Sequence, residues 1–306
     1  MSDAINNMAR SVHDRLLNAA KQTGQPYNEL QQRFAMQRFL YRLSVSPFAG
    51  QFTLKGALAF LAWTGGKQMY RPTMDIDLLG RTSNDAENLA RVFRAVAEQD
   101  VPNDGLVFDP NSITAAPIAE DAEYNGMRVR LSGRMGNARI AIQIDIGFGD
   151  LPLPKPQRLE LPGLLDFSSL SMTGYRPESS IAEKLQAMVA RDVLNSRMKD
   201  FADLWYLSQH FDFDGSLLAE AIASTFERRK TAVPANPTAF SIEFAQREDK
   251  QAQWKAFMRR SRPEGMPDEL AAAVAGVAAF LSPILSHLAA DQPMPRHWQA
   301  PGPWQS

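Results

Sequence analysis

The chain has 306 residues, which is enough for one large domain or two of ordinary size. Its 33 basic and 34 acidic residues leave a formal net charge of −1, which excludes the global basic field of many nucleic-acid-binding proteins. The absence of cysteine excludes disulfides, thiolate zinc sites and a cysteine nucleophile.

Helices and strands alternate in the first part of the sequence. Apolar residues recur at helical spacing over residues 4 to 22 and 27 to 44, which predicts two opening helices. Residues 52 to 54 form a short β-prone run that meets Gly56, and residues 57 to 63 have a helical composition. We therefore expect a strand, a glycine turn and a helix.

Three more strands and a helix follow. Residues 74 to 79 and 139 to 146 alternate apolar and polar side chains, the pattern of a strand with one wet face. Residues 127 to 131 predict another strand, and residues 85 to 98 predict a helix. Strands and helices mixed in this way indicate an α+β core.

The second part of the chain is expected to be helical. Residues 147 to 162 are dense in proline and glycine, which places a domain boundary there and predicts two domains, residues 1–160 and 161–306. A tail from Gln292, rich in proline, is expected to be loosely ordered. The helices expected between boundary and tail cover residues 178 to 193, 197 to 209, 215 to 229, 240 to 260 and 267 to 289.

Three aspartates are candidate metal ligands. Asp75 and Asp77 lie on one face of a single expected strand, roughly 6–7 Å apart at the backbone. Asp145 interrupts an isoleucine-rich strand in the same way. Carboxylates placed like this can converge on two Mg²⁺ ions, or on Mn²⁺, and support an in-line displacement at phosphorus. A solvated edge strand is the alternative, but aspartate is disfavoured in strands and occurs three times here.

Residues near the aspartates are candidates for binding a nucleotide. Free N–H groups at the start of the helix after Gly56 suit a phosphate, and Lys55 is adjacent. An ordinary strand-to-helix turn is the alternative. Arg71 could contact a phosphate bidentately and Thr73 could donate a hydrogen bond near the metal, although a surface ion pair explains Arg71 equally well.

A second group of charged residues lies on two later helices. Lys184 and Arg191 share one helix face, and Lys199, Asp200 and Asp203 cluster on the next helix. These residues could hold a triphosphate. Ordinary salt bridges on the helix surface are the alternative.

Four segments in the correct order resemble the AbiEii/AbiGii-type nucleotidyltransferase toxins, also grouped with MenT-like toxins. They span roughly residues 52 to 207. The segments are LKGALAFLAW, RPTMDIDLLG, IQIDIGFGD and PESSIAEKLQAMVARDVLNSRMKDFADLWYL.

The resemblance implies a fold and a set of roles. The fold is a nucleotidyltransferase-like mixed β-sheet flanked by helices, followed by a C-terminal helical domain. Mg²⁺ would bind at the paired aspartates, with Asp145 as third carboxylate or base. Lys184 and Lys199 would serve the nucleotide's phosphates, and Asp200 would be a further essential active-site residue. Ala57 stands where many members have Gly or Ser, but its backbone N–H can still face a phosphate.

The resemblance also implies partners. Family members are toxins of two-gene toxin–antitoxin or phage-defence systems, and some add nucleotides to the 3′ end of tRNA. We therefore expect an NTP substrate, an RNA acceptor such as tRNA, and a cognate antitoxin protein. A protein or small-molecule acceptor, or a non-catalytic nucleotide-binding role, is the alternative. No run approaches the roughly 20 apolar residues of a membrane helix and no signal peptide is present, so we expect a cytoplasmic protein without a membrane partner.

Overall fold

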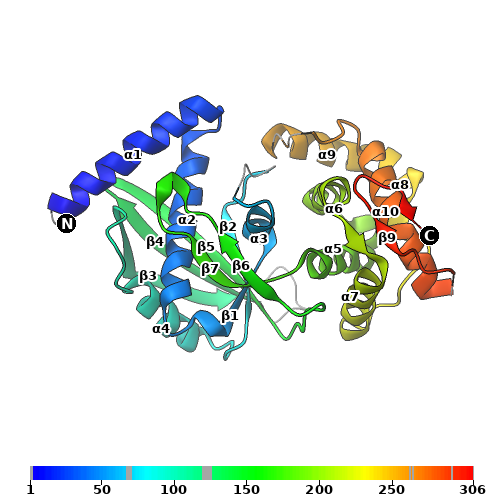
Figure 1. Ribbon diagram of the computed structural model, residues 1–306, viewed down its shortest axis with the longest axis horizontal. Coiled ribbons are helices and arrows are strands. Elements are labelled where there is room, and N and C mark those ends of the chain that lie inside the picture. Colours follow the sequence, from blue (N-terminus) through cyan, green and yellow to red (C-terminus); the bar gives the residue numbers. More distant parts are fainter. Residues whose placement is uncertain are drawn as a thin grey trace. The chain divides into compact units, whose positions relative to one another are not determined.

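The chain folds into two compact units, seen in a computed structural model (Figure 1). The structure describes residues 3–66, 71–118, 126–261, 263, 265–290 and 292–305. The first unit comprises Met1–Asp150 and Gln157–Tyr175, and the second comprises Leu151–Pro156 and Arg176–Ser306.

A seven-stranded mixed sheet forms the centre of the first unit, with the order β3-β4-β5-β2-β1-β7-β6. Strand β2 is parallel to β5 and β1 is parallel to β7, while all other neighbours are antiparallel. The strands are β1 (Phe52–Lys55), β2 (Asp75–Gly80), β3 (Leu106–Pro117), β4 (Met127–Met135), β5 (Ala138–Phe148), β6 (Gln157–Leu161) and β7 (Leu170–Gly174). The predicted mixed sheet with flanking helices is confirmed.

Helices cover the apolar side of this sheet. They are α1 (Asp3–Thr23), α2 (Tyr27–Val45), α3 (Gly56–Trp63) and α4 (Ala86–Ala97). Helix α2 crosses the sheet in Figure 1, and Phe34, Phe39 and Leu43 on it are completely buried. The alternating isoleucines of β5 and Ile76 of β2 belong to the same core. The period of two thus places one set of residues in this core and leaves the other set free for chemistry.

Three strands of the first unit were missed by the sequence analysis. Strand β3 carries Pro110 and a register shift between Asp109 and Thr114, which breaks its alternation; a proline is tolerated there because β3 is an edge strand. Strands β6 and β7 are short and follow a proline-rich segment. Because they return to the sheet, the first unit extends to Tyr175, beyond the boundary expected at residue 160.

The second unit is mostly helical, as expected. Its helices are α5 (Pro177–Arg191), α6 (Met198–His210), α7 (Gly215–Arg228), α8 (Ile242–Gln246), α9 (Glu248–Ser261) and α10 (Leu270–Ala290). The single helix expected over residues 240 to 260 is two helices, separated at Arg247, whose backbone is extended (ψ 135°).

The C-terminal tail is ordered, and the prediction of a loose tail was wrong. Strands β9 (His297–Trp298) and β10 (Trp304–Gln305) form a small sheet with β8 (Phe213–Asp214). The indole N–H of Trp298 donates to Ser208 O at 2.8 Å, and that of Trp304 donates to Phe280 O at 2.7 Å. Two tryptophans with satisfied N–H groups bury enough apolar surface to hold a proline-rich segment.

By length and composition alone, helix α10 could cross a membrane, with a mean hydropathy of 1.7 over 18 residues. The sequence-based statement that no run approaches this length was therefore wrong for this segment. Its residues Val277, Phe280, Leu281 and Ile284 are completely buried. The helix contacts α6, α7, α8 and α9, so its apolar composition has a structural explanation as the central helix of the second unit.

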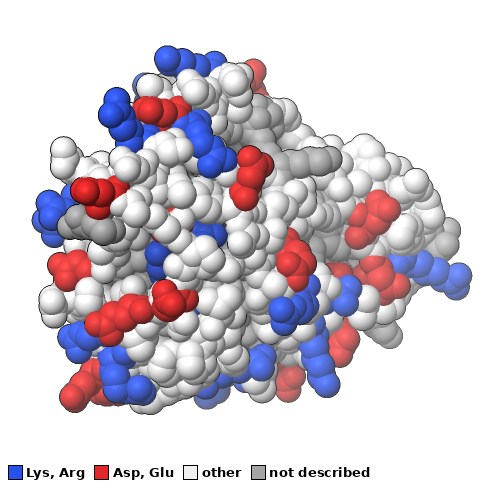
Figure 2. Space-filling view, turned by 60° about the vertical axis from the view of Figure 1, so that its left-hand side comes forward, with Lys and Arg blue, Asp and Glu red and all other residues white. Residues whose placement is uncertain are grey.

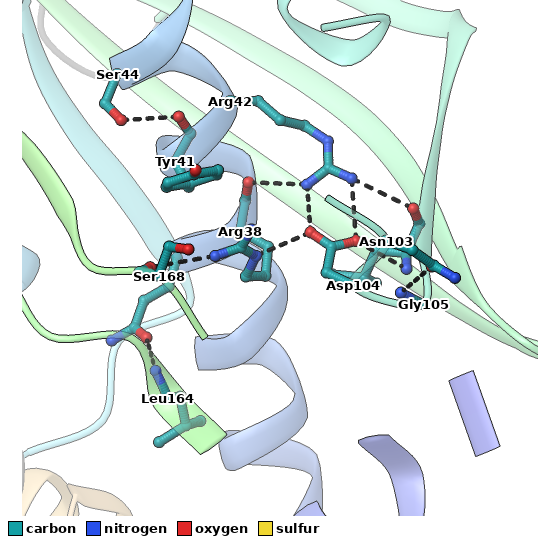
Figure 3. Close-up of polar contacts among 11 residues, drawn as sticks. Arg38, Tyr41, Arg42, Ser44, Asn103, Asp104, Gly105, Leu164 and Ser168 are labelled. Atoms are coloured by element: carbon teal, nitrogen blue, oxygen red, sulfur yellow. Dashed lines mark hydrogen bonds and ion pairs between the residues drawn. The ribbon is translucent and has the colours of Figure 1, made fainter. Parts of the chain in front are cut away.

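Charged side chains of both signs are interspersed over the surface shown in Figure 2, as the balanced composition predicts. One group of charges in the first unit is instead buried (Figure 3). Arg42 of α2 holds Asp104 bidentately at 2.6 and 3.0 Å, and Arg38 Nε donates to the same carboxylate at 2.8 Å. Arg38 also donates to Ser168 O at 3.3 Å. The cluster therefore connects α2 with the segment before β3 and with the segment before β7.

The Asp104 cluster should make stability depend on pH. Burial by itself would raise the pKa of Asp104, but hydrogen bonds and charge from Arg42 and Arg38 outweigh it and hold that pKa below its usual value. A carboxyl whose pKa is lower in the folded state stabilises above its unfolded pKa, and this stability is lost as pH falls through the folded pKa.

We predict that Asp104→Asn lowers the free energy of unfolding by about 3–5 kcal/mol at pH 7, because two buried guanidinium groups lose their counter-charge. Urea unfolding measures the change. The deficit should shrink as the pH falls from about 4, where Asp104 of the unfolded chain takes up a proton, through the lower pKa of the folded state, where the folded carboxyl loses its charge as well. Asp100→Asn, which changes an exposed carboxylate nearby, is the control and should be near neutral. An equal effect of both variants would contradict the role of the cluster.

Candidate functional site

Four charged residues lie side by side across four strands of the sheet. Strand register pairs Lys55 of β1 with Asp77 of β2, Asp77 with Asp145 of β5, and Asp145 with Arg128 of β4. Residues paired in register point to the same face of a sheet. Neighbouring strands are roughly 4.8 Å apart, so the two carboxylates are adjacent and are flanked by one cation on each side.

Asp75 lies on the same face of β2, two residues before Asp77. It pairs in register with Gln143, and its Oδ1 accepts a hydrogen bond from Thr73 Oγ1 at 2.7 Å. Asp75, Asp77 and Asp145 are all partly exposed. The convergence of the three aspartates on one accessible face, predicted from the sequence, is therefore present in the strand register.

The start of α3 lies directly against Asp77. Gly56, its first residue, has φ +66°, and a Cβ added there would collide with Asp77 Oδ2. Only glycine combines this backbone conformation with so close a carboxylate. The N-cap residue Lys55 makes no side-chain hydrogen bond to the first turn of α3. The backbone N–H groups of that turn, including that of the buried Ala57, thus begin beside the carboxylates.

Arg128 is a site residue that the sequence analysis missed. Its Nε and Nη2 donate to the two oxygens of Asp145, both at 2.8 Å, in the fork geometry of a bidentate pair. The side chains of Arg128 and Asp145 are 21% and 18% exposed, so solvent weakens the pair only partly. The sequence places Arg128 on a predicted strand, but only the β4–β5 register brings it to Asp145.

Lys55 and Arg71 lie near the same face. Lys55 Nζ is 5.6 Å from the centre of the Tyr175 ring, and a Cβ added at Gly147 would be 3.4 Å from this nitrogen. Lys55 therefore extends over the residues that follow Asp145 on β5. Arg71 Nη1 donates to Pro72 O at 3.4 Å, so the guanidinium lies close to the start of β2.

The donor set fits Mg²⁺ with two protein carboxylates. Mg²⁺ is commonly held by one or two carboxylates, with water and substrate phosphates as further ligands, and Asp75 and Asp77 are accessible for this. Within the described part of the chain, no group of three or more His, Cys, Asp or Glu side chains is arranged to hold a metal ion. Arg128 occupies both oxygens of Asp145, which leaves that carboxylate its remaining lone pairs.

The charged residues predicted on the later helices form a cluster within the second unit. Lys184 Nζ of α5 lies 3.0 Å from Asp200 Oδ1 and 2.5 Å from Asp203 Oδ2 of α6. Arg197 Nε lies 2.5 Å from Asp200 Oδ2. Both aspartates are almost completely buried, whereas Lys199 is exposed. Lys184, Asp200 and Asp203 therefore form buried ion pairs and not salt bridges on the helix surface, and their role in binding a triphosphate stays a prediction.

The two buried aspartates have opposite electrostatic environments. Burial opposes the charge of Asp200, but Lys184, Arg197 and Lys199 outweigh it and lower the pKa of Asp200 well below its usual value. Burial raises the pKa of Asp203 well above its usual value. Three cations act on Asp200, whereas burial dominates at Asp203, so Asp200 carries the charge and Asp203 favours the proton.

We predict that Gly56→Ala lowers the free energy of unfolding by about 1–2 kcal/mol from the left-handed backbone conformation alone. Displacement of Asp77 by the new methyl group should add to this loss. Urea unfolding measures it. Gly50→Ala is a matched control, because no atom lies within 4 Å of a Cβ added there and its φ is not positive. A Gly56 variant as stable as the Gly50 variant would show that Asp77 does not constrain residue 56.

We predict that Asp200→Asn lowers the free energy of unfolding by about 3–5 kcal/mol at pH 7, because Lys184 and Arg197 lose a buried partner. Asp203→Asn should cost far less. A carboxyl whose pKa is raised by folding stabilises only below its unfolded pKa, so at pH 7 the wild-type Asp203 carries a penalty that asparagine removes. As the pH falls toward about 4, the free energy of unfolding of wild type should rise relative to that of Asp203→Asn. Equal losses for the two variants at pH 7 would contradict this assignment.

Comparison with known proteins gives this arrangement a context. The chain shares 16% identity with JHP933 from Helicobacter pylori, over 84% of this chain and 93% of that one, with a TM-score of 0.50. A Helicobacter pylori protein described as a candidate nucleotidyltransferase has 17% identity, coverage of 85% and 96%, and a TM-score of 0.49. No curated protein matches the sequence. The model of the family described as nucleotidyl transferase AbiEii toxin, type IV toxin–antitoxin system, matches residues 38–276, so the chain belongs to this family.

Proposed function

We propose that this AbiEii-family protein transfers a nucleoside monophosphate from an NTP to the 3′ hydroxyl of an RNA. The observation that carries the proposal is the placement of Asp75, Asp77 and Asp145 on one accessible face of adjacent strands, beside the start of α3. A helix start next to carboxylates suits a metal-bound triphosphate. The choice of tRNA among RNAs rests on the sequence resemblance alone.

The proposed metal requirement follows from the same residues. Asp75 and Asp77 would hold Mg²⁺, and Asp145 has lone pairs left to join them or to accept a proton. When bound, the ions offset charge on the phosphate oxygens and favour in-line displacement at phosphorus. Thr73 orients Asp75 through its hydrogen bond, and Arg128 orients Asp145.

In the proposed reaction, the acceptor oxygen attacks the α-phosphorus of the NTP. A new P–O bond forms, the bond from the α-phosphorus to the bridging oxygen of the β-phosphate breaks, and pyrophosphate leaves. The acceptor proton passes to Asp145. Lys55, Arg71 and the backbone N–H groups of Gly56 and Ala57 offset the charge of the triphosphate.

The roles of the second unit in this reaction stay predictions. Lys184 and Lys199 are proposed to serve the nucleotide's phosphates, and Asp200 is proposed as a further essential residue. Because Lys184 and Asp200 also form buried ion pairs, loss of activity after their substitution has to be separated from loss of folding. The family belongs to type IV toxin–antitoxin systems, so a cognate antitoxin is the expected protein partner. We place the reaction in the cytoplasm.

The test is incubation of the purified protein with total tRNA, Mg²⁺ and each α-labelled NTP in turn. We expect one NTP to label the RNA, and chelation of Mg²⁺ to abolish the label. Asp75→Asn and Asp77→Asn should each lower the rate by about 10³-fold or more, because several kcal/mol of transition-state stabilisation depends on the metal. Asp14→Asn, at an exposed position of α1, is the matched control and should leave the rate unchanged.

The outcomes separate the candidate reactions. Label on RNA that both active-site variants lose would establish the reaction and identify the nucleotide. Label on protein or on a small molecule would show that the acceptor is not RNA, while the nucleotidyl-transfer reaction would stay the same. Nucleotide binding without transfer to any acceptor would favour a non-catalytic binding protein.

A further inference from the structure

The carboxylates occupy only one end of an exposed sheet face. The opposite face of β4 and β5 is buried against the helices, and its residues include Val129, Leu131, Ile142 and Ile144. On the exposed face, beyond Arg128, β4 carries Arg130 and Arg134, and β5 carries Arg139. We name these three residues the arginine file. All three are exposed.

The arginine file is continuous with the proposed reaction site. Arg130 follows Arg128 by two residues on β4, and it pairs in register with Gln143, which pairs in turn with Asp75. Arg134 pairs directly with Arg139, six residues before Asp145 on β5. With about 3.3–3.4 Å per residue, the file ends roughly 20 Å from the carboxylates.

The clustering of the three arginines costs stability, and no pairing with another described side chain offsets this cost. Within the described residues, the side chains of Arg130, Arg134 and Arg139 make no hydrogen bond or ion pair. Like charges directly opposite each other on two strands are destabilising, which is the situation of Arg134 and Arg139. Asp109, an acidic residue among those described on this stretch of the face, accepts a hydrogen bond from the N–H of Asn111 at 2.9 Å.

We propose that the arginine file binds the phosphates of the single-stranded 3′ end of the acceptor RNA and leads its hydroxyl to the carboxylates. The inference rests on the proposed function. Arg130 and Arg134 are four residues apart on β4, about 13–14 Å, which is about twice the distance between successive phosphates of an extended strand. Because acidic and basic residues are mixed over the surface in Figure 2, attraction of a polyanion requires such a local array. Guanidinium groups suit phosphate, and an open sheet face suits an extended strand.

The test compares two triple variants. Arg130→Gln, Arg134→Gln and Arg139→Gln together remove the file. Arg10→Gln, Arg91→Gln and Arg94→Gln together remove the same charge from exposed positions of α1 and α4, which cover the other face. The dissociation constant of a labelled, unstructured RNA is measured over a series of salt concentrations, and NTP binding is measured in parallel.

The file variant should bind the RNA roughly tenfold to a hundredfold more weakly at about 0.1 M salt, with a salt slope smaller by about 2, because each phosphate contact contributes about 0.7 on a single strand. Its NTP affinity should be unchanged, and its melting temperature should be equal or higher because a like-charge pair is removed. The control variant should retain most of the RNA affinity of wild type.

Three results would overturn the proposal. The first is an RNA affinity and a salt slope that are unchanged in the file variant while the wild-type protein still transfers label to RNA. This result would reject RNA binding by the arginine file and leave the proposed function standing. An equal loss in the control variant would show that overall charge binds the RNA. If the wild-type protein neither binds nor labels RNA, the proposed function and the proposed role of the arginine file are both rejected.

Discussion

The position of β2 between β1 and β5 is the constraint on which the candidate site depends. Asp77 is opposite Lys55 on one side and Asp145 on the other, while Ile76 and Leu78 enter the core. A slip of one residue would move the carboxylates into the core and the apolar side chains into water, so the burial of one face fixes the chemistry of the other. The close approach of Gly56 to Asp77 then fixes where α3 begins.

Each unit also contains a buried charge cluster. In the first unit, Arg38 and Arg42 share Asp104, so a single carboxylate is more than compensated and its pKa is lowered. In the second unit, Lys184 and Arg197 hold the charge of Asp200, while burial raises the pKa of Asp203, which also lies beside Lys184. Acidification therefore weakens the first cluster through loss of a needed charge, whereas it relieves the penalty carried by Asp203.

One face of the sheet combines functions that are separate in sequence. The carboxylates lie at one end of this face, Arg128 orients Asp145, and the arginine file extends along β4 and β5. In the proposed function, charge of both signs on one rigid surface would give a metal-bound nucleotide and a polyanionic acceptor separate binding sites. A net charge of −1 does not oppose the proposed local binding of RNA, because Coulomb interactions at the surface are screened within about 10 Å at ordinary salt.

The sequence by itself determined the family, the mixed sheet and the shared face of Asp75 and Asp77, because a period of two is a local property that survives in any sheet. It did not reveal β6 and β7, whose short alternation follows a proline-rich segment, or the tail, which depends on two indoles reaching distant carbonyl groups. Only the tertiary structure paired Arg128 with Asp145, since strand register is set by packing of the whole sheet. It also decided that Lys184 lies between two buried carboxylates, because helix periodicity gives a face but not what covers it.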